Sequence, residues 1–359
     1  MVKIGVLCLF YNELYISDLL IVLETGLPWD QLQNKTILIT GSTGCIGSVL
    51  VDVLMYFNKL RDGNIKIIAI GRNKENARNR FNEYFNNNNF TFVEQDISLP
   101  LQINIDVNYI IHAASNADPI SFATDPVGTM KSNFMGMYHL LEYAKTHHTQ
   151  RVLYISSGEV YGQGDNNITS FSEDYCGYID YINPRACYPS SKRAAETLCA
   201  SYIKQYKLDA VIARPCHVYG ATFARSDSRV IAQFLRAVVS GEDIIMKSEG
   251  SQIRSYCYVA DVVSGLLYIL FYGETGQAYN IADKNSIVSI KKLAEILAAV
   301  GNKKVRYEIP DLIEKSGYSG VTRAVLDSSK IESLGWNPKI GIEEGLKKTL
   351  NILINTRNN

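Results

Sequence analysis

The segment RACYPSSK at residues 185–192 carries a tyrosine and a lysine four positions apart, Tyr188 and Lys192. Positions i and i+4 of a helix lie on one face, so the Lys192 ammonium group is expected close to the Tyr188 phenol, where its charge favours the phenolate. A phenol that loses its proton near neutral pH is a general base for oxidising an alcohol. About one such pair is expected by chance in a chain this rich in tyrosine, and the alternative interpretation is an amphipathic tyrosine on a surface helix.

A glycine-rich loop, GSTGCIG at residues 41–47, directly follows a predicted strand and directly precedes a predicted helix. Gly41 permits the tight turn, Gly44 lets the backbone approach a pyrophosphate, and Gly47 lets helix and strand pack closely. The helix N-terminus offers free N–H groups and a favourable dipole to phosphate. The spacing is G-x-x-G-x-x-G rather than G-x-G-x-x-G. The loop therefore predicts a dinucleotide site, with a purely structural turn as the alternative.

The next two predicted strands end in residues that could meet the adenosine half of such a cofactor. The second strand runs into Gly71-Arg72-Asn73-Lys74, which has no acidic residue for the ribose hydroxyls. Arg72 can instead meet a 2′-phosphate or stack on adenine, or belong to a solvated basic turn, so NAD and NADP both stay open. Asp96 and Ile97 follow the third strand and are candidates for the adenine amino group.

These residues need a scaffold, and the apolar pattern supplies one. Strands alternate with helices over the first two thirds of the chain, which predicts a parallel sheet covered on both faces. The predicted strands are 35–40, 65–70, 90–94, 109–113, 151–156 and 211–214, and the predicted helices are 48–60, 126–147 and 188–206.

At 359 residues the chain is long for one core, so a large domain with a smaller lobe is expected. Residues 1–34 are predicted to be an arm with a short helix that packs against the body or a partner subunit. Residues 35–215 form the predicted dinucleotide-binding domain. Residues 216–359, with helices but no regular alternation, form the predicted mixed α/β substrate lobe, some of whose segments return to the main sheet.

Composition excludes several classes of partner. The chain has 36 basic and 36 acidic residues, which gives no reason to expect nucleic acid or an anionic membrane. Seven cysteines without C-x-x-C pairs or nearby histidines predict reduced, buried thiols in a cytoplasmic protein and no metal site. The apolar run at residues 4–11 is too short and lacks the cleavage site of a signal peptide, and no run approaches the length of a membrane span.

Further short motifs follow the glycine loop in a fixed order. They are His112-Ala113-Ala114-Ser115, Asn133, Ser156-Ser157, Glu159-Val160-Tyr161-Gly162, Tyr188 with Lys192, Arg214 with Tyr219-Gly220, Arg254 with Tyr258-Val259 and Asp261, and Leu334-Gly335-Trp336 with Pro338. From about Lys35 to Leu350 the chain thus resembles the extended short-chain dehydrogenase/reductases that modify nucleotide sugars, the NAD-dependent epimerase/dehydratase group. The set is highly specific for this superfamily, though not for one reaction within it.

The resemblance implies a Rossmann doubly wound sheet that binds NAD(P) and a lobe that binds a nucleoside-diphosphate sugar, with a UDP-sugar as the first candidate. Tyr188 would take the proton from the sugar 4-OH while C4 delivers a hydride to nicotinamide. Lys192 would lower the tyrosine pKa and hold the nicotinamide ribose, and Ser157 would hydrogen-bond to the 4-oxygen. The helices 126–147 and 188–206 correspond to the dimer interface of relatives, which implies a homodimer.

Two sets of binding residues are expected from the motifs and this resemblance. The cofactor set is Gly41, Thr43, Gly44, Cys45, Ile46, Gly47, Arg72, Asp96, Ile97, Ala113, Ala114, Ser115, Asn133, Ser156, Tyr188, Lys192, Pro215 and His217. The substrate set is Ser157, Gly158, Glu159, Arg185, Arg229, Arg254 and Arg323.

Several members of these sets have a competing interpretation. Arg229, Arg254 and Arg323 suit a diphosphate because a guanidinium group forks onto two oxygens, but each also fits a surface salt bridge. His217 stands where relatives commonly carry Asn, and Ala221 stands where they carry Pro. His217 either contacts nicotinamide or the sugar, or is a satisfied core histidine.

The reaction is inferred from the residues after Ser157. The ketone of a 4-keto sugar weakens the bonds of groups attached near C5. Glu159 matches a glutamate of UDP-glucuronate decarboxylases and of 4,6-dehydratases. Its alternative role is to order the loop at Tyr161. A dehydratase also uses an aspartate to protonate the leaving hydroxyl, and Gly158 occupies that position, which argues against 4,6-dehydration. The segments most like the decarboxylase branch are 185–188, 192–196, 228–230 and 250–255.

Decarboxylation of UDP-glucuronate is therefore the predicted activity, with Tyr188, Lys192, Ser157 and Glu159 as catalytic residues. A nucleotide-sugar 4-epimerase and an NADPH-dependent 4-keto-sugar reductase remain alternatives, the latter because of Arg72 and the departures around His217. A catalytically silent dinucleotide-binding protein is an alternative of another class. The presence of Tyr188, Lys192 and Ser157 argues against this alternative, because a protein that only binds a dinucleotide does not need a catalytic base.

Overall fold

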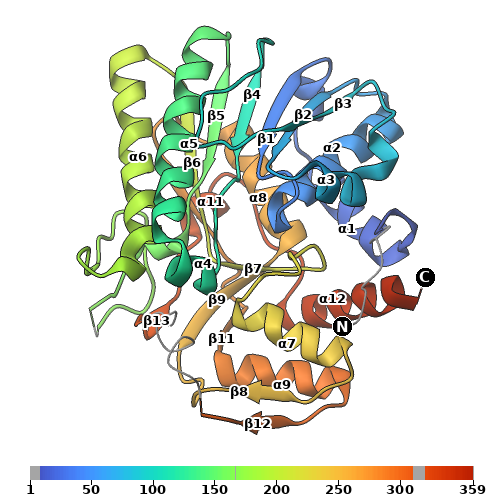
Figure 1. Ribbon diagram of the computed structural model, residues 1–359, viewed down its shortest axis with the longest axis vertical. Coiled ribbons are helices and arrows are strands. Elements are labelled where there is room, and N and C mark those ends of the chain that lie inside the picture. The colour runs from blue at the N-terminus through green and yellow to red at the C-terminus, as the bar shows by residue number, and fades with distance from the viewer. Residues whose placement is uncertain (1–8, 166, 310–319, 359) are drawn as a thin grey trace.

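Seven parallel strands form the central sheet of the protein, whose computed structural model describes residues 9–165, 167–309 and 320–358 (Figure 1). The strand order is β10-β6-β5-β4-β1-β2-β3, and every neighbouring pair is parallel. The strands are β1 (Thr36–Thr40), β2 (Lys66–Gly71), β3 (Phe90–Glu94), β4 (Tyr109–His112), β5 (Arg151–Ile155), β6 (Ala210–Pro215) and β10 (Ala278–Ile281). The predicted doubly wound parallel sheet is confirmed. Its strand order reverses between β1 and β4, where such sheets bind ligands.

Helices cover both faces because the strands are apolar on both sides. Ile37 and Ile39 of β1 belong to one apolar core, whereas Leu38 between them belongs to the other. In Figure 1, α5 and α6 lie side by side on one face and α2 and α8 on the other. The helices around the sheet are α2 (Cys45–Arg61), α3 (Lys74–Phe81), α4 (Pro119–Thr124), α5 (Pro126–Thr146), α6 (Cys187–Tyr206) and α8 (Val259–Tyr272).

The N-terminal arm packs against the body of the molecule. Its helix α1 (Glu13–Leu23) contacts α2 and α8, and the Trp29 ring stacks on Phe57 with the ring centroids 5.0 Å apart. The buried carboxylate of Asp52 on α2 accepts hydrogen bonds from Tyr15 on α1 and from Arg80 on α3. Burying a charge is costly unless it is paired, so these partners tie the arm and α3 to α2.

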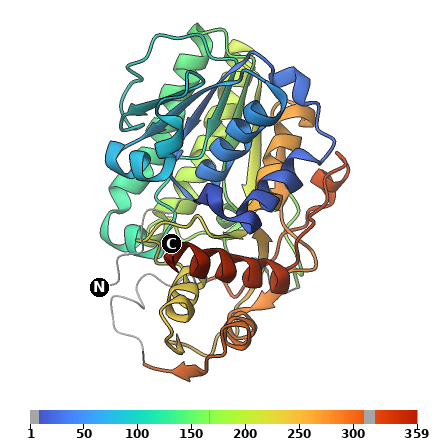
Figure 2. The same ribbon diagram turned by 90° about the vertical axis from the view of Figure 1, so that its right-hand side faces the viewer.

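The remaining segments form a smaller mixed lobe below the carboxyl edge of the main sheet. A four-stranded sheet joins β7, β9, β11 and β13, and β8 pairs with β12. Figure 2 shows the C-terminal helix α12 lying between the arm and the lobe helices, which it contacts. The lobe elements are β7 (His217–Tyr219), α7 (Val230–Val239), β8 (Ile244–Met246), β9 (Ile253–Tyr258), β11 (Ile287–Ser289), α9 (Ile290–Gly301), β12 (Val305–Tyr307), β13 (Arg323–Ala324), α11 (Ser329–Glu332) and α12 (Ile342–Asn358).

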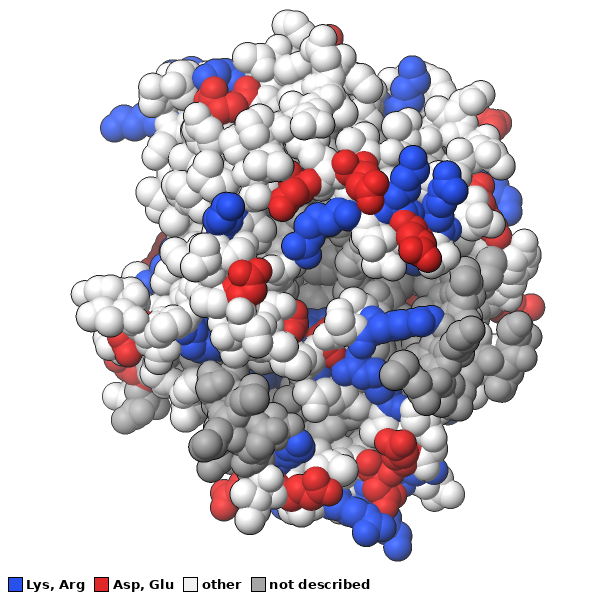
Figure 3. All heavy atoms as spheres, in the orientation of Figure 1, with Lys and Arg blue, Asp and Glu red and all other residues white. Residues whose placement is uncertain are grey.

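Two segments after residue 216 belong to the main sheet rather than the lobe. Strand β10 pairs with β6, and α8 packs against β5 and β6. On the face shown in Figure 3, positive and negative side chains are interspersed rather than gathered by sign. Within the described ranges, no helix is long and apolar enough to cross a bilayer.

Candidate active site

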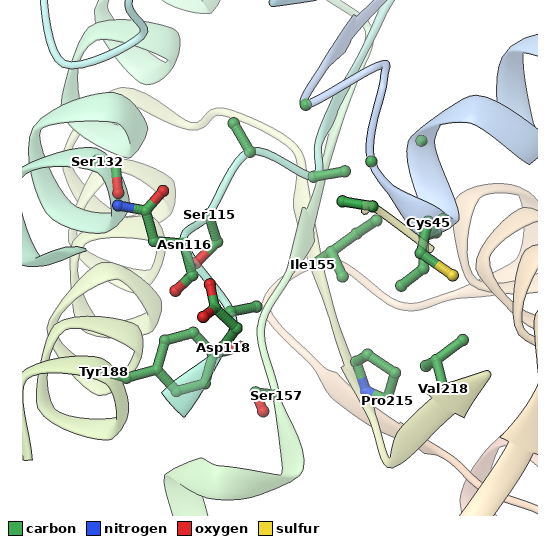
Figure 4. Close-up of a pocket in the computed structure, with 18 of the residues that line it drawn as sticks. Cys45, Ser115, Asn116, Asp118, Ser132, Ile155, Ser157, Tyr188, Pro215 and Val218 are labelled. Atoms are coloured by element: carbon green, nitrogen blue, oxygen red, sulfur yellow. The ribbon is translucent and has the colours of Figure 1, made fainter. Parts of the chain in front are cut away.

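A pocket of about 490 Å³ opens at the carboxyl ends of the central strands and extends to the lobe (Figure 4). Its walls come from the loops that follow β1, β2, β3, β4, β5 and β6. Of the predicted cofactor set, every residue except Asn133 lines this pocket, and of the predicted substrate set, Ser157, Gly158, Glu159 and Arg229 do. One end of the pocket carries the glycine loop and the other carries Tyr188.

The glycine loop has the geometry of a phosphate cradle. Gly41 has φ +63°, and a Cβ added there would lie 2.7 Å from the Ala113 carbonyl carbon. A Cβ at Gly47 would lie 2.3 Å from the Gly41 carbonyl oxygen, so this position brings α2 against the loop. Among the residues that the structure describes, no side chain caps the start of α2 at Gly44, which leaves first-turn amides available to an anion. These residues fit a dinucleotide diphosphate.

The predicted adenosine-side residues Arg72, Asp96 and Ile97 line the pocket from the loops after β2 and β3. Arg72 donates a hydrogen bond of 3.2 Å to the Asn116 side-chain oxygen, so it faces the loop after β4. The Asp96 carboxylate accepts a hydrogen bond of 2.8 Å from the Ser98 amide. Asn133 is buried behind the pocket wall instead, where its amide donates to Ser191 on α6 at 3.0 Å.

Tyr188 and Lys192 are both buried on α6 and stack as their spacing predicts. The Lys192 Nζ lies 5.7 Å from the Tyr188 ring centroid and donates a hydrogen bond of 2.8 Å to the carbonyl of Ile155. Burial lowers the pKa of Lys192 to about 7, against the charge of Glu196. The lysine is therefore held at the ring face and against the end of β5.

The electrostatics of Tyr188 differ from the prediction. Burial raises the pKa of Tyr188 to about 12, with Glu159 adding to the rise, while a hydrogen bond with Ser157 and the charges of Arg229 and Arg185 lower the pKa. In the protein without ligand the net effect of the fold is thus to raise this pKa. The cations that lower the pKa are Arg229 and Arg185, which come from other segments, and the Lys192 ammonium group donates to the carbonyl of Ile155.

Glu159 is held beside Tyr188 by local structure and by Arg185. It lies in the 3-10 turn η4 (Gly158–Tyr161), and its amide donates to the Ser157 hydroxyl at 3.1 Å. Arg185 forks onto the Glu159 carboxylate at 3.2 and 3.3 Å. Arg185 does not line the pocket itself, so it reaches the site through this ion pair.

Phe122 on α4 forms a layer between the arginine and the tyrosine. Its ring stacks on Tyr188 with centroids 4.7 Å apart, and the Arg185 guanidinium lies 4.5 Å from its centroid. No motif in the sequence indicated Phe122. The only local signal was Asp118-Pro119, an N-cap residue followed by proline, which marks the start of α4.

The three predicted diphosphate arginines have different surroundings. Arg229 lines the pocket and pairs with Asp227 at 2.6 Å. Arg254 is buried and donates to the carbonyls of Ile253 and Val321 at 2.9 and 2.6 Å, and Arg323 donates to the Thr169 carbonyl at 2.7 Å. The fold places Arg254 and Arg323 outside the pocket lining, because their guanidinium groups satisfy backbone carbonyls of neighbouring segments.

His217 lies in the pocket wall rather than in the core. Burial lowers the pKa of His217 to about 3, together with the charges of Arg254 and Arg229, so its imidazole is neutral at physiological pH. The neutral His217 imidazole in the pocket wall can form hydrogen bonds with a ligand but carries no charge to pair with a ligand's phosphates.

Two segments that line the pocket were predicted only in part from the sequence. They are the loop after β4 and residues 220–229, which we name the crossing loop. Their additional lining residues are Asn116, Ala117, Asp118, Ala224, Ser226 and Asp227.

Comparison with known proteins agrees with this architecture. UDP-glucuronic acid decarboxylase 1 of Xenopus tropicalis is 33% identical over 319 residues, covering 88% of this chain and 72% of the relative. UDP-glucuronic acid decarboxylase 3 of Arabidopsis thaliana is 34% identical over 316 residues, covering 87% of each chain. A UDP-glucose 4-epimerase structure from Thermotoga maritima superposes with a TM-score of 0.73 at 25% identity, covering 89% of this chain and 99% of that one.

The fold alone is also shared with a dTDP-glucose 4,6-dehydratase of Streptomyces venezuelae, with a TM-score of 0.77 at 24% identity, covering 90% and 98% of the two chains. The model of the NAD dependent epimerase/dehydratase family matches residues 37–282. That match spans the main sheet, the glycine loop and the Tyr188 segment. The chain therefore belongs to the NAD-dependent epimerase/dehydratase family.

Proposed function

We propose that this enzyme modifies a nucleotide sugar and that it decarboxylates UDP-glucuronate after oxidising the sugar at C4. The observation that carries the proposal is that Tyr188, Ser157 and Glu159 line one pocket with the glycine loop. The decarboxylase relatives, at 33% and 34% identity, support the choice of substrate.

NAD is the cofactor that the family description names, and the pocket fits it. The glycine loop and the first turn of α2 would hold the diphosphate, Asp96 and Ile97 would meet adenine, and Lys192 would meet the nicotinamide ribose. Bound NAD would supply the hydride acceptor for C4, and the positive charge of its oxidised ring would favour a nearby phenolate.

Two side chains of the protein then handle the proton and the oxygen at C4. Tyr188 accepts the proton of the 4-OH, and the Ser157 hydroxyl holds the 4-oxygen in line with it. The resulting 4-keto sugar is a β-keto acid when C5 carries a carboxylate, so the C5–carboxyl bond breaks, its electron pair forms an enolate with the C4 ketone, and carbon dioxide leaves. The enolate would take a proton at C5 from solvent, and a hydride at C4 and the Tyr188 proton at the 4-oxygen would then restore the alcohol. We assign Glu159, held by Arg185, to this second stage at C5 rather than to the oxidation at C4.

The surroundings of Gly158 support decarboxylation over 4,6-dehydration. A Cβ at this position would lie 3.0 Å from a methyl carbon of Leu326, a residue that also lines the pocket. An aspartate there, which a dehydratase needs as an acid, would require this leucine methyl group to shift by a few tenths of an ångström. Gly158 itself carries no group that can protonate a leaving hydroxyl.

The direct test is incubation with UDP-glucuronate and with a panel of other UDP-, dTDP-, GDP- and CDP-sugars, followed by mass spectrometry. We expect UDP-glucuronate to lose the mass of carbon dioxide. Loss of water would show a dehydratase, and gain of two hydrogens with NADPH would show a reductase. An unchanged mass with a changed sugar would show an epimerase, and each of these three outcomes contradicts the proposal.

Replacing Glu159 by glutamine should separate the two stages. The amide keeps an acceptor for Arg185 but removes the carboxylate charge, so we expect carbon dioxide release to fall about a hundredfold while C4 oxidation persists. Single-turnover absorbance of NADH reports the oxidation, and trapped carbon dioxide reports the second stage. If both stages fall together with the melting temperature, Glu159 only orders the loop at Tyr161.

We also propose that the enzyme is a homodimer through α5. The apolar side chains Val127, Met130, Phe134 and Tyr138 are 38–68% exposed and recur at helical spacing along one face of that helix. We expect Phe134→Glu to sediment at the chain mass of 40.1 kDa and the wild type at twice that mass. Val300→Glu, at a 39% exposed position on α9, is the matched control and should stay dimeric. A monomeric wild type would refute this interface.

A further inference from the structure

The crossing loop, residues 220–229, connects the lobe to two separate points on the dinucleotide-binding part of the molecule. At its beginning, the Thr222 hydroxyl donates a hydrogen bond of 2.8 Å to the carbonyl of Cys45, in the first turn of α2. At its end, the Ser228 hydroxyl donates a hydrogen bond of 2.7 Å to the Asp118 carboxylate, at the start of α4. Between these anchors, Ala224, Ser226 and Asp227 line the pocket. The loop therefore passes over the pocket from the glycine-loop side to the Tyr188 side.

The two anchors are not equal in strength. Asp118 is a carboxylate, and a hydrogen bond to a charged acceptor is about twice as strong as one between neutral groups such as Thr222 and a carbonyl. Ser228 is only 7% exposed, so little water competes for its hydroxyl, which also accepts from the Ile120 amide at 3.1 Å. The Ser228–Asp118 bond is thus the stronger of the two attachments.

Asp118 connects the loop to the catalytic tyrosine as well. The same carboxylate caps α4 through the amide and hydroxyl of Ser121, at 3.2 and 2.6 Å. Phe122, the next residue of α4, stacks on the Tyr188 ring. Figure 4 shows Asp118 and Tyr188 on the same side of the pocket. One carboxylate therefore holds the crossing loop, the start of α4 and, through Phe122, the base.

We propose that the Ser228–Asp118 hydrogen bond is a clasp that keeps the crossing loop closed over the dinucleotide site and sets how long the cofactor stays bound. The inference rests on the proposed function only in taking this pocket as the NAD site. A reaction that removes a hydride and later returns it to the same sugar cannot be completed if the reduced cofactor dissociates between the two steps. Asp118 is in this sense a positioning residue, since it acts through the loop and through α4.

The test measures cofactor release without any sugar. The protein is loaded with NADH and mixed with excess NAD, and the decay of protein-bound NADH fluorescence gives the release rate. Ser228→Ala should accelerate release about tenfold, whereas Ser228→Thr keeps the hydroxyl and should stay within about threefold of the wild type. Ser329→Ala is the matched control, because it removes a serine-to-aspartate hydrogen bond, the one to Asp327, that lies outside the pocket.

Release from Ser228→Ala within about twofold of the wild-type rate would overturn the clasp. Asp118→Asn provides a second variant in case Ser228→Ala does not fold, since asparagine still caps α4 but removes the charge. It too should accelerate release, and an unchanged rate would again refute the clasp. If the variants release NADH faster but the wild type does not turn over UDP-glucuronate, the clasp stands and the proposed function is refuted. If the wild type turns over UDP-glucuronate but the variants release NADH at the wild-type rate, the proposed function stands and the clasp is refuted.

Discussion

Tyr188→Phe is expected to lower turnover of UDP-glucuronate by about a thousandfold while NADH binding persists. The phenylalanine ring keeps the stack on Phe122, whose centroid lies 4.7 Å away, and loses only the hydroxyl. That oxygen is the proposed acceptor for the 4-OH proton, and its hydrogen bond with Ser157 places it in the pocket. Binding should survive because the glycine loop is untouched.

The measurement is kcat by mass spectrometry of the product, together with a fluorescence titration of NADH. Tyr272→Phe removes a phenolic hydroxyl from a 44% exposed position at the end of α8 and serves as the matched control, with turnover unchanged. Substantial turnover by Tyr188→Phe would mean that another group is the base. Loss of NADH binding together with turnover would mean that the variant damaged the pocket rather than the chemistry.

Gly47→Ala is expected to weaken NADH binding by about a hundredfold and to lower the melting temperature. The new Cβ would lie 2.3 Å from the Gly41 carbonyl oxygen and 3.1 Å from the Ser42 Cα. Both are backbone atoms of the cradle, so neither can rotate aside as a side chain would. Helix α2 must move away from the loop, which carries its first-turn amides away from the diphosphate.

Fluorescence titration and thermal melting of the same samples separate the loss of the site from the loss of the fold. Gly341→Ala is the control, because a Cβ there meets no atom of the described chain within 4 Å and its backbone is outside the left-handed region. Its affinity and melting temperature should match the wild type. Unchanged NADH affinity in Gly47→Ala would place the cofactor somewhere other than the glycine loop.

Much of the fold was predictable because the signals that specify a strand are local. The apolar run at residues 90–94 is strand β3 with the predicted bounds, and the predicted helix 188–206 differs from α6 by one residue. Helix α3 was missed because its residues, KENARNRF, are mostly polar and offer little periodicity. Its contacts with the core, through Ala77 and Phe81, and the ion pair of Arg80 with Asp52, 28 residues away on another helix, form only in the folded chain.

The residues of the site likewise fall into a group that was predictable from local sequence and a group that was not. The glycine loop was found because its spacing is a local requirement of a strand–turn–helix junction, as φ +63° at Gly41 and the contacts of Gly47 demonstrate. Arg254 and Arg323 were assigned to the pocket by resemblance, but neither lines it. The direction of an arginine side chain depends on which carbonyls the fold brings near it, and those belong to distant segments.

The sequence by itself determined the alternating strands and helices that imply a parallel sheet, the cradle for a dinucleotide and the stacking of Lys192 on Tyr188, because the signal for each lies in residues within a few positions of one another. Only the tertiary structure decided the protonation of that tyrosine. Its pKa of about 12 reflects burial, opposed by Ser157, Arg229 and Arg185, and its ring is set by Phe122. Charges and solvent act through space, so a base inferred from spacing alone acquires its pKa only when the chain has folded around it.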